Sequence, residues 1–381
     1  MKPSHLLQAA VLGAPLIQAL VFPVPNTPYK VQWTSAELID HARPDPFNAS
    51  HPRRTMISRF TPIPNHACLR TCLVPYLNPF MSSLEDSIIS AFFGPDVSWP
   101  HGILSALELE VCCQVKHRNS RSTKKFPTIL YGTGLNTSRL LYSASAQNLA
   151  SVGYEVVVMD HPYETDAVQF PDGSVVYGGR VPRDPQAGEA LAFALDVRSK
   201  DAAMVLDYLG IREERGERGR VGFVGDSFGG PAAADVMLKD ARVGAGVNVD
   251  GLMFGPAVDE GVARPFLVFA SPGHNSSSLE SWGRFRNATR EKHPGTWFKE
   301  VNLADSVHGI LIDFGLIGDV AGLRDNDKLV GNLFGKITGA RTMKILREYF
   351  SDFFGFALEG KDQGLLAGPS KKYPEVSFVE Y

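Results

Sequence analysis

The sequence lacks a strong excess of charge of either sign. Its 38 Lys and Arg residues nearly balance 41 Asp and Glu residues, which leaves a formal net charge of -3 over 381 residues. A protein that binds nucleic acid through its phosphates needs a concentration of positive charge. The composition therefore predicts no nucleic-acid partner.

Several other signatures are missing. No regular internal repeat or low-complexity tract appears, which argues against a solenoid or a disordered scaffold. No His-Glu-x-x-His cluster is present, and no Gly-Lys-Ser/Thr follows a glycine-rich loop, so we expect neither a metal ion nor another cofactor. With 44% hydrophobic residues, the chain can bury one large core of catalytic size.

Cysteine is scarce, and the four residues form two close pairs, Cys68 with Cys72 and Cys112 with Cys113. Their spacing does not match that of a zinc finger. In an oxidising compartment, two disulfides would join the first pair to the second. The sequence does not decide which cysteine bonds to which.

The amino terminus has the pattern of a secretory signal. Lys2 precedes an apolar stretch over residues 6–20, and no further charged Asp, Glu, Lys or Arg follows until Lys30. The alternatives are a buried first helix or a membrane anchor, but the stretch is short for a span of ~20 apolar residues. We therefore expect a signal peptide over residues 1–20 and a secreted protein. Four sequons would accept glycans there: Asn48, Asn136, Asn275 and Asn287.

The rest of the chain divides by pattern into three parts. Residues 21–125 are rich in Pro, Asn and Ser, and we interpret them as a disulfide-stapled extension that covers the main fold. Residues 126–360 alternate strands and helices, as in a mostly parallel central sheet with helices on both faces, and residues 361–381 form a tail. Within the extension, residues 54–62 are a strand candidate, and residues 107–115 could form a further strand. In the core, the expected strands are 126–131, 154–160, 221–225, 243–249 and 265–271, and the expected helices are 138–152, 188–209 and 341–358.

The segment VGFVGDSFGG, residues 221–230, predicts a strand, a sharp turn and a helix around Ser227. This is the context in which Gly-x-Ser-x-Gly forms a nucleophile elbow. The motif also arises by chance in a glycine-rich chain, so it needs partners. In the corresponding hydrolases the acid and then the histidine follow the serine along the chain.

Three histidines follow Ser227. His274 lies in a serine-rich loop and His293 in a charged run, so we interpret both as surface residues. His308 lies in a loop before an apolar segment, where a base can be held at the rim of a core. We predict His308 as the base.

The acid is predicted from the end of a strand. Asp250 follows the apolar run 243–249 and precedes Gly251, which places a carboxylate at the end of a buried strand. Asp305 is the rival because it lies near His308, but there it would more naturally shape the loop through an Asx-turn. We therefore prefer Asp250.

These residues define a chemistry. His308 would take the proton of Ser227 during attack, and Asp250 would hold the imidazole in the required tautomer. The oxyanion would be bound by the backbone N–H of Phe228 and by that of Thr133, which lies in a glycine-rich loop after the first strand of the core.

The sequence resembles the plasma-type and type II platelet-activating factor acetylhydrolases, a phospholipase branch of the α/β-hydrolase fold. The resemblance lies in segments that occur in family order between residues 126 and 354: YGTGLNTSR (131–139), LYSA (141–144), LASVGY (149–154), VGDSFGG (224–230), VDGLMFGP (249–256), DSVHG (305–309) and IDF (312–314). It implies the same roles for Ser227, Asp250, His308, Phe228 and Thr133. It also implies calcium-independent hydrolysis of short or oxidised sn-2 acyl esters of phospholipids.

Two residues depart from the family pattern. Asp226 stands where the family more often has His, and Tyr131 replaces the His that commonly opens the oxyanion loop. We interpret Asp226 as an exposed residue of the turn. The amino-terminal third and the tail match the family poorly, so the chemistry is better defined than the substrate.

We expect a small lipid ester as substrate and a transient contact with a lipid surface, for which the apolar residues 88–94 are a candidate. One alternative is an esterase of another class that acts on polyesters, feruloyl esters or other non-phospholipid esters. The other is a catalytically silent protein of hydrolase fold that binds lipid.

Overall fold

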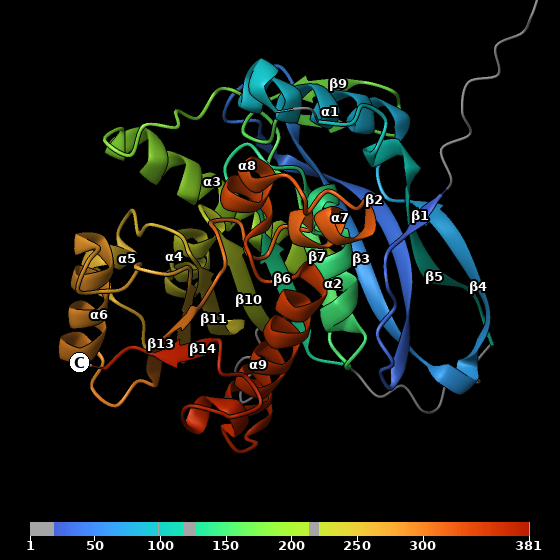
Figure 1. Ribbon diagram of the computed structural model, residues 1–381. Helices are drawn as coiled ribbons and strands as arrows, with labels where there is room; N and C mark the ends of the chain where they lie inside the picture. Colours follow the sequence, from blue (N-terminus) through green and yellow to red (C-terminus); the bar gives the residue numbers. More distant parts are fainter. Residues whose placement is uncertain (1–18, 98, 117–125, 213–220, 381) are drawn as a thin grey trace, which may run out of the picture.

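The computed structural model describes residues 19–97, 99–116, 126–212 and 221–380. The expected signal peptide, residues 1–20, lies almost entirely outside these ranges. A nine-stranded sheet runs through the molecule in the order β14-β13-β12-β11-β10-β6-β7-β3-β2 (Figure 1). Six strands are parallel: β6 (Thr128–Gly132), β7 (Glu155–Met159), β10 (Val221–Asp226), β11 (Val243–Val249), β12 (Phe266–Ala270) and β13 (Phe298–Leu303).

Helices cover both faces of this sheet, which is why its central strands are short and apolar throughout. On one face, α2 (Ser143–Ala150) and α9 (Gly339–Glu359) contribute to the largest hydrophobic cluster. On the other face, α3 (Gly188–Tyr208), α4 (Gly229–Lys239) and α6 (Glu280–Lys292) contribute to a second cluster. Shorter helices are α5 (Ala257–Glu260), α7 (Phe314–Val320) and α8 (Asp327–Leu329). The predicted α/β-hydrolase fold is confirmed.

The long terminal helix α9 shows how local sequence sets the element bounds. The side chain of Thr338 accepts a hydrogen bond from the backbone N–H of Arg341 and caps the first turn. Gly360 ends the helix with a left-handed φ of 69°, a conformation that glycine adopts without strain. Between these caps, apolar residues at helical spacing face the sheet.

The two ends of the chain do more than cover the main fold. β3 (Pro52–Pro64) pairs antiparallel with β7, and the long edge strand β2 (Tyr29–Pro44) pairs with β3. In the tail, β14 (Val376–Phe378) pairs with β13 at the opposite edge. The expected division at residue 126 therefore does not separate the sheet from its cover. The strand predicted over residues 54–62 lies within β3, whereas the edge strand β2 and the tail strand β14 were not predicted.

A smaller sheet carries the cysteines. It contains β1 (Leu20–Val21), β5 (Leu107–Val115) and β4 (Cys68–Pro75), and disulfides join Cys68 to Cys112 and Cys72 to Cys113. The predicted bridges between the two pairs are confirmed, and the structure supplies the pairing. The remaining elements of this side are α1 (Pro79–Phe93) and the hairpin β8 (Ala167–Gln169) and β9 (Val175–Tyr177).

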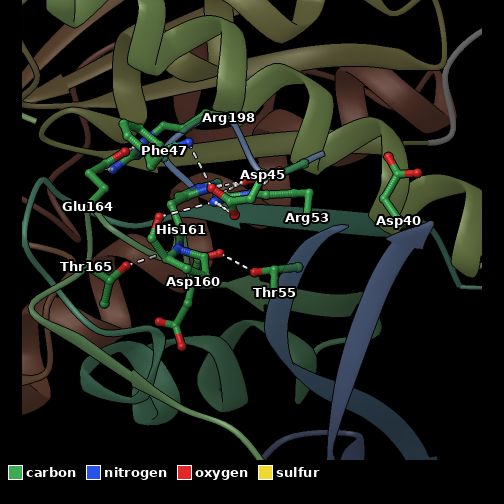
Figure 2. Close-up of polar contacts among 12 residues, drawn as sticks. Asp40, Asp45, Phe47, Arg53, Thr55, Asp160, His161, Glu164, Thr165 and Arg198 are labelled. Carbon is green, nitrogen blue, oxygen red and sulfur yellow. Dashed lines mark hydrogen bonds and ion pairs between the residues drawn. The ribbon is translucent and has the colours of Figure 1, made fainter. Parts of the chain in front are cut away.

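A buried cluster of charges ties β3 to α3 (Figure 2). Arg53 binds Asp201 through Nε and Nη2 at 3.1 and 2.6 Å, and its Nη1 lies 3.0 Å from Asp45. His161 donates from Nδ1 to Asp201 at 3.0 Å, since an ionised carboxylate only accepts. Burial lowers the pKa of this imidazole and so favours its neutral form. Burial alone would raise the pKa of Asp201, but Arg53 and the hydrogen bond from His161 hold that pKa well below its usual range.

We predict that Asp201→Asn lowers the free energy of unfolding by about 3–5 kcal/mol at pH 7, because it leaves the buried guanidinium of Arg53 short of charge. Asp207→Asn, on the same helix, is the control. Asp207 is 73% exposed and paired only at the surface with Arg242, so its loss should cost less than about 1 kcal/mol.

Urea unfolding of both variants measures these differences. Because the pKa of Asp201 is depressed, its contribution is present above the unfolded pKa of about 3.9 and is lost as the pH falls further. Equal stability of the two variants at pH 7 would contradict the role given to the cluster.

Candidate active site

The proposed site lies where the order of the parallel strands reverses. After β6 the chain continues to β7 on one side, whereas β10 lies on the other side of β6 and leads on to β11. The loops after β6 and β10 therefore diverge at the carboxyl ends of the strands. Crevices at such switch points are the usual binding sites of open α/β sheets.

Ser227 occupies a tight turn between β10 and α4. Its φ is 51°, an uncommon value for a residue other than glycine. A Cβ atom on Gly225 would lie 1.8 Å from the Gly229 carbonyl oxygen, and one on Gly229 would lie 2.2 Å from that of Gly132. Glycine is therefore required on both sides of the serine. The turn is fixed further by Ser227 N, which donates to the Val249 carbonyl at 2.9 Å.

The three predicted triad residues lie in one hydrogen-bonded line. His308 Nε2 is 3.0 Å from Ser227 Oγ, and His308 Nδ1 is 2.8 Å from Asp250 Oδ2. Asp250 follows β11 with a φ of 57°, and its N–H donates to the Phe269 carbonyl at 3.0 Å. This geometry can deliver the serine proton to an imidazole whose tautomer is set by a carboxylate.

The rival acid, Asp305, takes no part in this line. Its side chain is exposed, and its carbonyl accepts from Lys336 N and Ile337 N at 2.7 and 3.1 Å. With a φ of 60°, it shapes the beginning of the loop that carries His308.

The other end of that loop is anchored by Asp313. Its buried carboxyl accepts hydrogen bonds from the backbone of Ala144 and Ser145, both at 2.8 Å, and from Tyr76 Oη at 3.0 Å. Burial raises the pKa of Asp313 to about 7. His308 is therefore exposed on a loop whose two ends are tied to the core.

Two carboxyl groups act on the imidazole. The hydrogen bond to Asp250 is the main cause of a raised pKa of His308, and the charge of Asp226 adds to it. For Asp250, burial opposes ionisation, but hydrogen bonds from His308 and Ser271 lower its pKa overall. The site is thus built around an ionised Asp250.

The prediction that Asp226 is exposed was wrong. This residue ends β10, which is buried along its whole length, and its Oδ2 accepts from Tyr142 Oη at 3.0 Å. Burial raises the pKa of Asp226 to about 6. Tyr142 Oη also accepts from Gly134 N at 2.9 Å, so Asp226 holds the glycine-rich loop through this tyrosine.

The predicted oxyanion donors lie near the two ends of the link from Gly134 through Tyr142 to Asp226. Thr133 and Phe228 are both buried, and neither backbone N–H donates to another group among the residues that the structure describes. Such free donors on a rigid backbone can stabilise charge that develops on a carbonyl oxygen. Their role stays a prediction.

Arg198 contacts both residues whose N–H groups are the predicted oxyanion donors, and it was not predicted from the sequence. This buried residue of α3 donates from Nη1 to the Thr133 carbonyl at 2.6 Å, and its guanidinium carbon lies 4.8 Å from the centre of the Phe228 ring. Glu164 pairs with it, with Nε 3.0 Å from Oε2 (residues labelled in Figure 2). No signal in the sequence marks Arg198, because it stands in the charged run 196–201 (DVRSKD), which is typical of an exposed helix face.

His274 makes a contact that was also not predicted. It lies in the loop after β12, and its Nδ1 is 2.9 Å from Asp250 Oδ1. His274 lies in a loop with 43% of its side chain exposed, as predicted, but its contact with the acid was missed. The contact forms because β12 pairs with β11, which brings this loop to Asp250.

The four sequons differ in their surroundings. Asn136 accepts from Arg183 Nε at 3.1 Å and bonds to Asp166, so a glycan there would break these contacts. Asn48 and Asn287 are exposed, whereas Asn275 is half-buried and caps a turn. Glycosylation stays a prediction.

Two kinds of feature are absent from the described residues. Among them, no group of three or more His, Cys, Asp or Glu could hold a metal ion. None of the described helices is both long enough and apolar enough to span a membrane.

Comparisons with known proteins agree with the resemblance. A family model described as platelet-activating factor acetylhydrolase, isoform II, matches residues 91–170. A probable 1-alkyl-2-acetylglycerophosphocholine esterase of Arthroderma benhamiae is 38% identical over 98% of this chain and 97% of its own length. A platelet-activating factor acetylhydrolase of Cavia porcellus is 23% identical over 65% of this chain and 64% of its own.

A solved structure is similar as well. The ferulic acid esterase of Streptomyces cinnamoneus superposes with a TM-score of 0.73 and 25% sequence identity, covering 95% of this chain and 100% of that one. The fold is therefore shared with an esterase named for a different ester.

We predict that Arg198→Met lowers kcat for short-acyl esters by about 10- to 100-fold with little change in KM, because the oxyanion donors lose their alignment. Glu164→Gln is the matched control, since it removes the paired charge but keeps the guanidinium and its bond to Thr133. Steady-state kinetics well below the Tm of both variants separate the effects. Equal loss of kcat in the two variants would contradict the role of Arg198.

Proposed function

Given that the chain belongs to the platelet-activating factor acetylhydrolase family, we propose that it is a serine esterase that removes short or oxidised acyl chains from the sn-2 position of phospholipids. The observation that carries this proposal is the unbroken line from Ser227 through His308 to Asp250. The names of its relatives in that family support a phospholipid substrate.

In the proposed mechanism, Ser227 Oγ attacks the ester carbonyl while His308 Nε2 takes its proton. The N–H groups of Thr133 and Phe228 bind the oxyanion. When the intermediate collapses, His308 returns the proton to the leaving lysophospholipid oxygen, and an acyl-enzyme remains on Ser227. Water then repeats the sequence and releases the fatty acid. No step requires calcium.

Arg183 is suited to bind the phosphate of such a substrate. It is 70% exposed, and it contacts Asn136, three residues after Thr133 in the oxyanion loop. Its other neighbour is Asp166, at 3.7 Å. Val181, two residues earlier, packs in a hydrophobic cluster with Phe228, which holds this segment beside the elbow. A guanidinium there favours a phosphodiester over a neutral ester.

The proposed location is outside the cell. The signal pattern over residues 1–20 and two disulfides in a small sheet support an oxidising compartment. For contact with a lipid surface we propose the end of α1, where Phe92 is 74% exposed.

A second candidate function is hydrolysis of non-phospholipid esters. It is favoured by the similarity to a ferulic acid esterase over almost the whole chain. Both functions use the same chemistry and differ in the alcohol or acyl group that is bound.

We predict that Ser227→Ala lowers hydrolysis of p-nitrophenyl acetate by at least about 10⁴-fold, since no other group replaces the nucleophile. Ser87→Ala, an exposed serine of α1, should leave the rate unchanged. Turnover by the Ser227 variant close to that of the control would refute the mechanism.

The substrate is tested with 1-alkyl-2-acetylglycerophosphocholine, phosphatidylcholines of graded sn-2 length, methyl ferulate and p-nitrophenyl acetate. We expect the highest kcat/KM among natural esters for the acetyl phospholipid. Arg183→Gln should reduce that value about 5- to 50-fold through loss of a charged hydrogen bond and leave p-nitrophenyl acetate unaffected, whereas Arg183→Lys should retain part of it. Preference for methyl ferulate would favour the second candidate function.

A further inference from the structure

The carboxylate of Asp250 is shared by two imidazoles. His308 donates to Oδ2 at 2.8 Å, and His274 donates to Oδ1 at 2.9 Å. Ser271 adds its backbone N–H on Oδ1 at 2.9 Å and its hydroxyl on Oδ2 at 2.7 Å. The Asp250 side chain is fully buried, so these four donors replace its hydration. A serine hydrolase triad needs only one of the two imidazoles.

His274 is held in place by its own surroundings. Its carbonyl accepts from Asn302 Nδ2 at 2.8 Å, and its N–H donates to the Ser271 carbonyl at 3.3 Å. The ring packs edge-on against Trp282, with centroids 6.5 Å apart. Backbone and ring contacts thus hold His274 beside Asp250, and its side chain remains 43% exposed.

We infer that His274 is a positioning residue of the active site. It fixes the carboxylate plane of Asp250 and weakens the electrostatic attraction between that carboxylate and the proton on His308. This inference rests on the proposed function. An ionised carboxylate only accepts hydrogen bonds, so His274 must donate from Nδ1, as His308 does. Each donor that stabilises the negative charge of Asp250 reduces the stabilisation that this charge gives to a protonated His308.

The sign of the effect follows from this competition. The base must be neutral to accept the serine proton, so activity is lost as the pH falls through the pKa of His308. Asp250 and Asp226 raise that pKa. On this inference, the hydrogen bond from His274 to Asp250 offsets part of the rise. Removing the donor should therefore move the acid limb of the pH profile to higher pH.

Charged side chains from β10, β13 and α6 also lie near the loop of His274 or face His308. Asp226 faces His308 from the end of β10 and is unchanged in the test. From β13, Glu300 accepts from Ser276 N at 2.9 Å, and from α6, Arg286 donates to Ser276 Oγ at 2.8 Å. Both bind the loop through Ser276, two residues beyond His274.

The test is the pH dependence of kcat/KM on p-nitrophenyl acetate for His274→Leu and His274→Asn. Leucine removes the donor, whereas the Asn amide nitrogen can take the place of Nδ1. We expect the acid-limb midpoint of the leucine variant to rise by about 0.5–1 pH unit, which is about a three- to tenfold loss at low pH. The acid-limb midpoint of the asparagine variant should lie close to that of the unmodified protein. His293→Leu, at a remote half-buried site after α6, is the control and should match the unmodified protein.

Two outcomes would overturn the inference. If His274→Leu keeps the midpoint of the unmodified protein, or if the leucine and asparagine variants lose rate equally without a shift, His274 does not tune the triad. Ser227→Ala is measured on the same ester: activity there would overturn the proposed function and this inference together. An inactive Ser227 variant with an unshifted His274→Leu profile would overturn this inference alone.

Discussion

The active site depends on the close contact between two backbones. The Cα of Gly229 lies so near the carbonyl of Gly132 that no side chain fits between them. This contact joins the start of α4 to the end of β6, so the proposed nucleophile and the proposed oxyanion loop share one rigid frame. Catalysis by preorganised donors requires this, because donors that must reorganise during the reaction lose their advantage. The left-handed backbone of Ser227 and Asp250 adds local strain, which the surrounding sheet must support.

Buried ionisable groups supply much of that support, at a cost in desolvation. Arg198 holds the glycine-rich loop that carries Thr133, and Asp226 binds the same loop through Tyr142. Asp313 anchors the separate loop of His308. Such groups are costly to bury, and their net contribution to stability is small or negative compared with apolar packing. Their directional bonds instead specify one loop geometry. The apolar clusters on both faces of the sheet provide the stability that permits this.

The sequence predicted the parts of the fold that are locally periodic. β11 has the predicted bounds, and the strand before Ser227 and helix α9 differ by at most two residues at each end. The long edge strand β2 was missed because a half-exposed strand with charged residues has no clear alternation. The proposed triad followed from chain order, whereas the contacts of Arg198 and His274 could not be predicted, because they arise only from which loops the sheet brings together. Pairing of adjacent cysteines is likewise a matter of register between β4 and β5.

The central claim is that an ester is cleaved through a covalent intermediate on Ser227. Its most direct test is rapid acid quenching of the protein during turnover of an isotopically labelled acetyl ester, followed by peptide mass spectrometry. The account predicts a labelled acetyl group on the peptide that contains Ser227, which disappears when the substrate is exhausted and never forms in Ser227→Ala. Turnover without a labelled Ser227 peptide, or with the label on another residue, would contradict it.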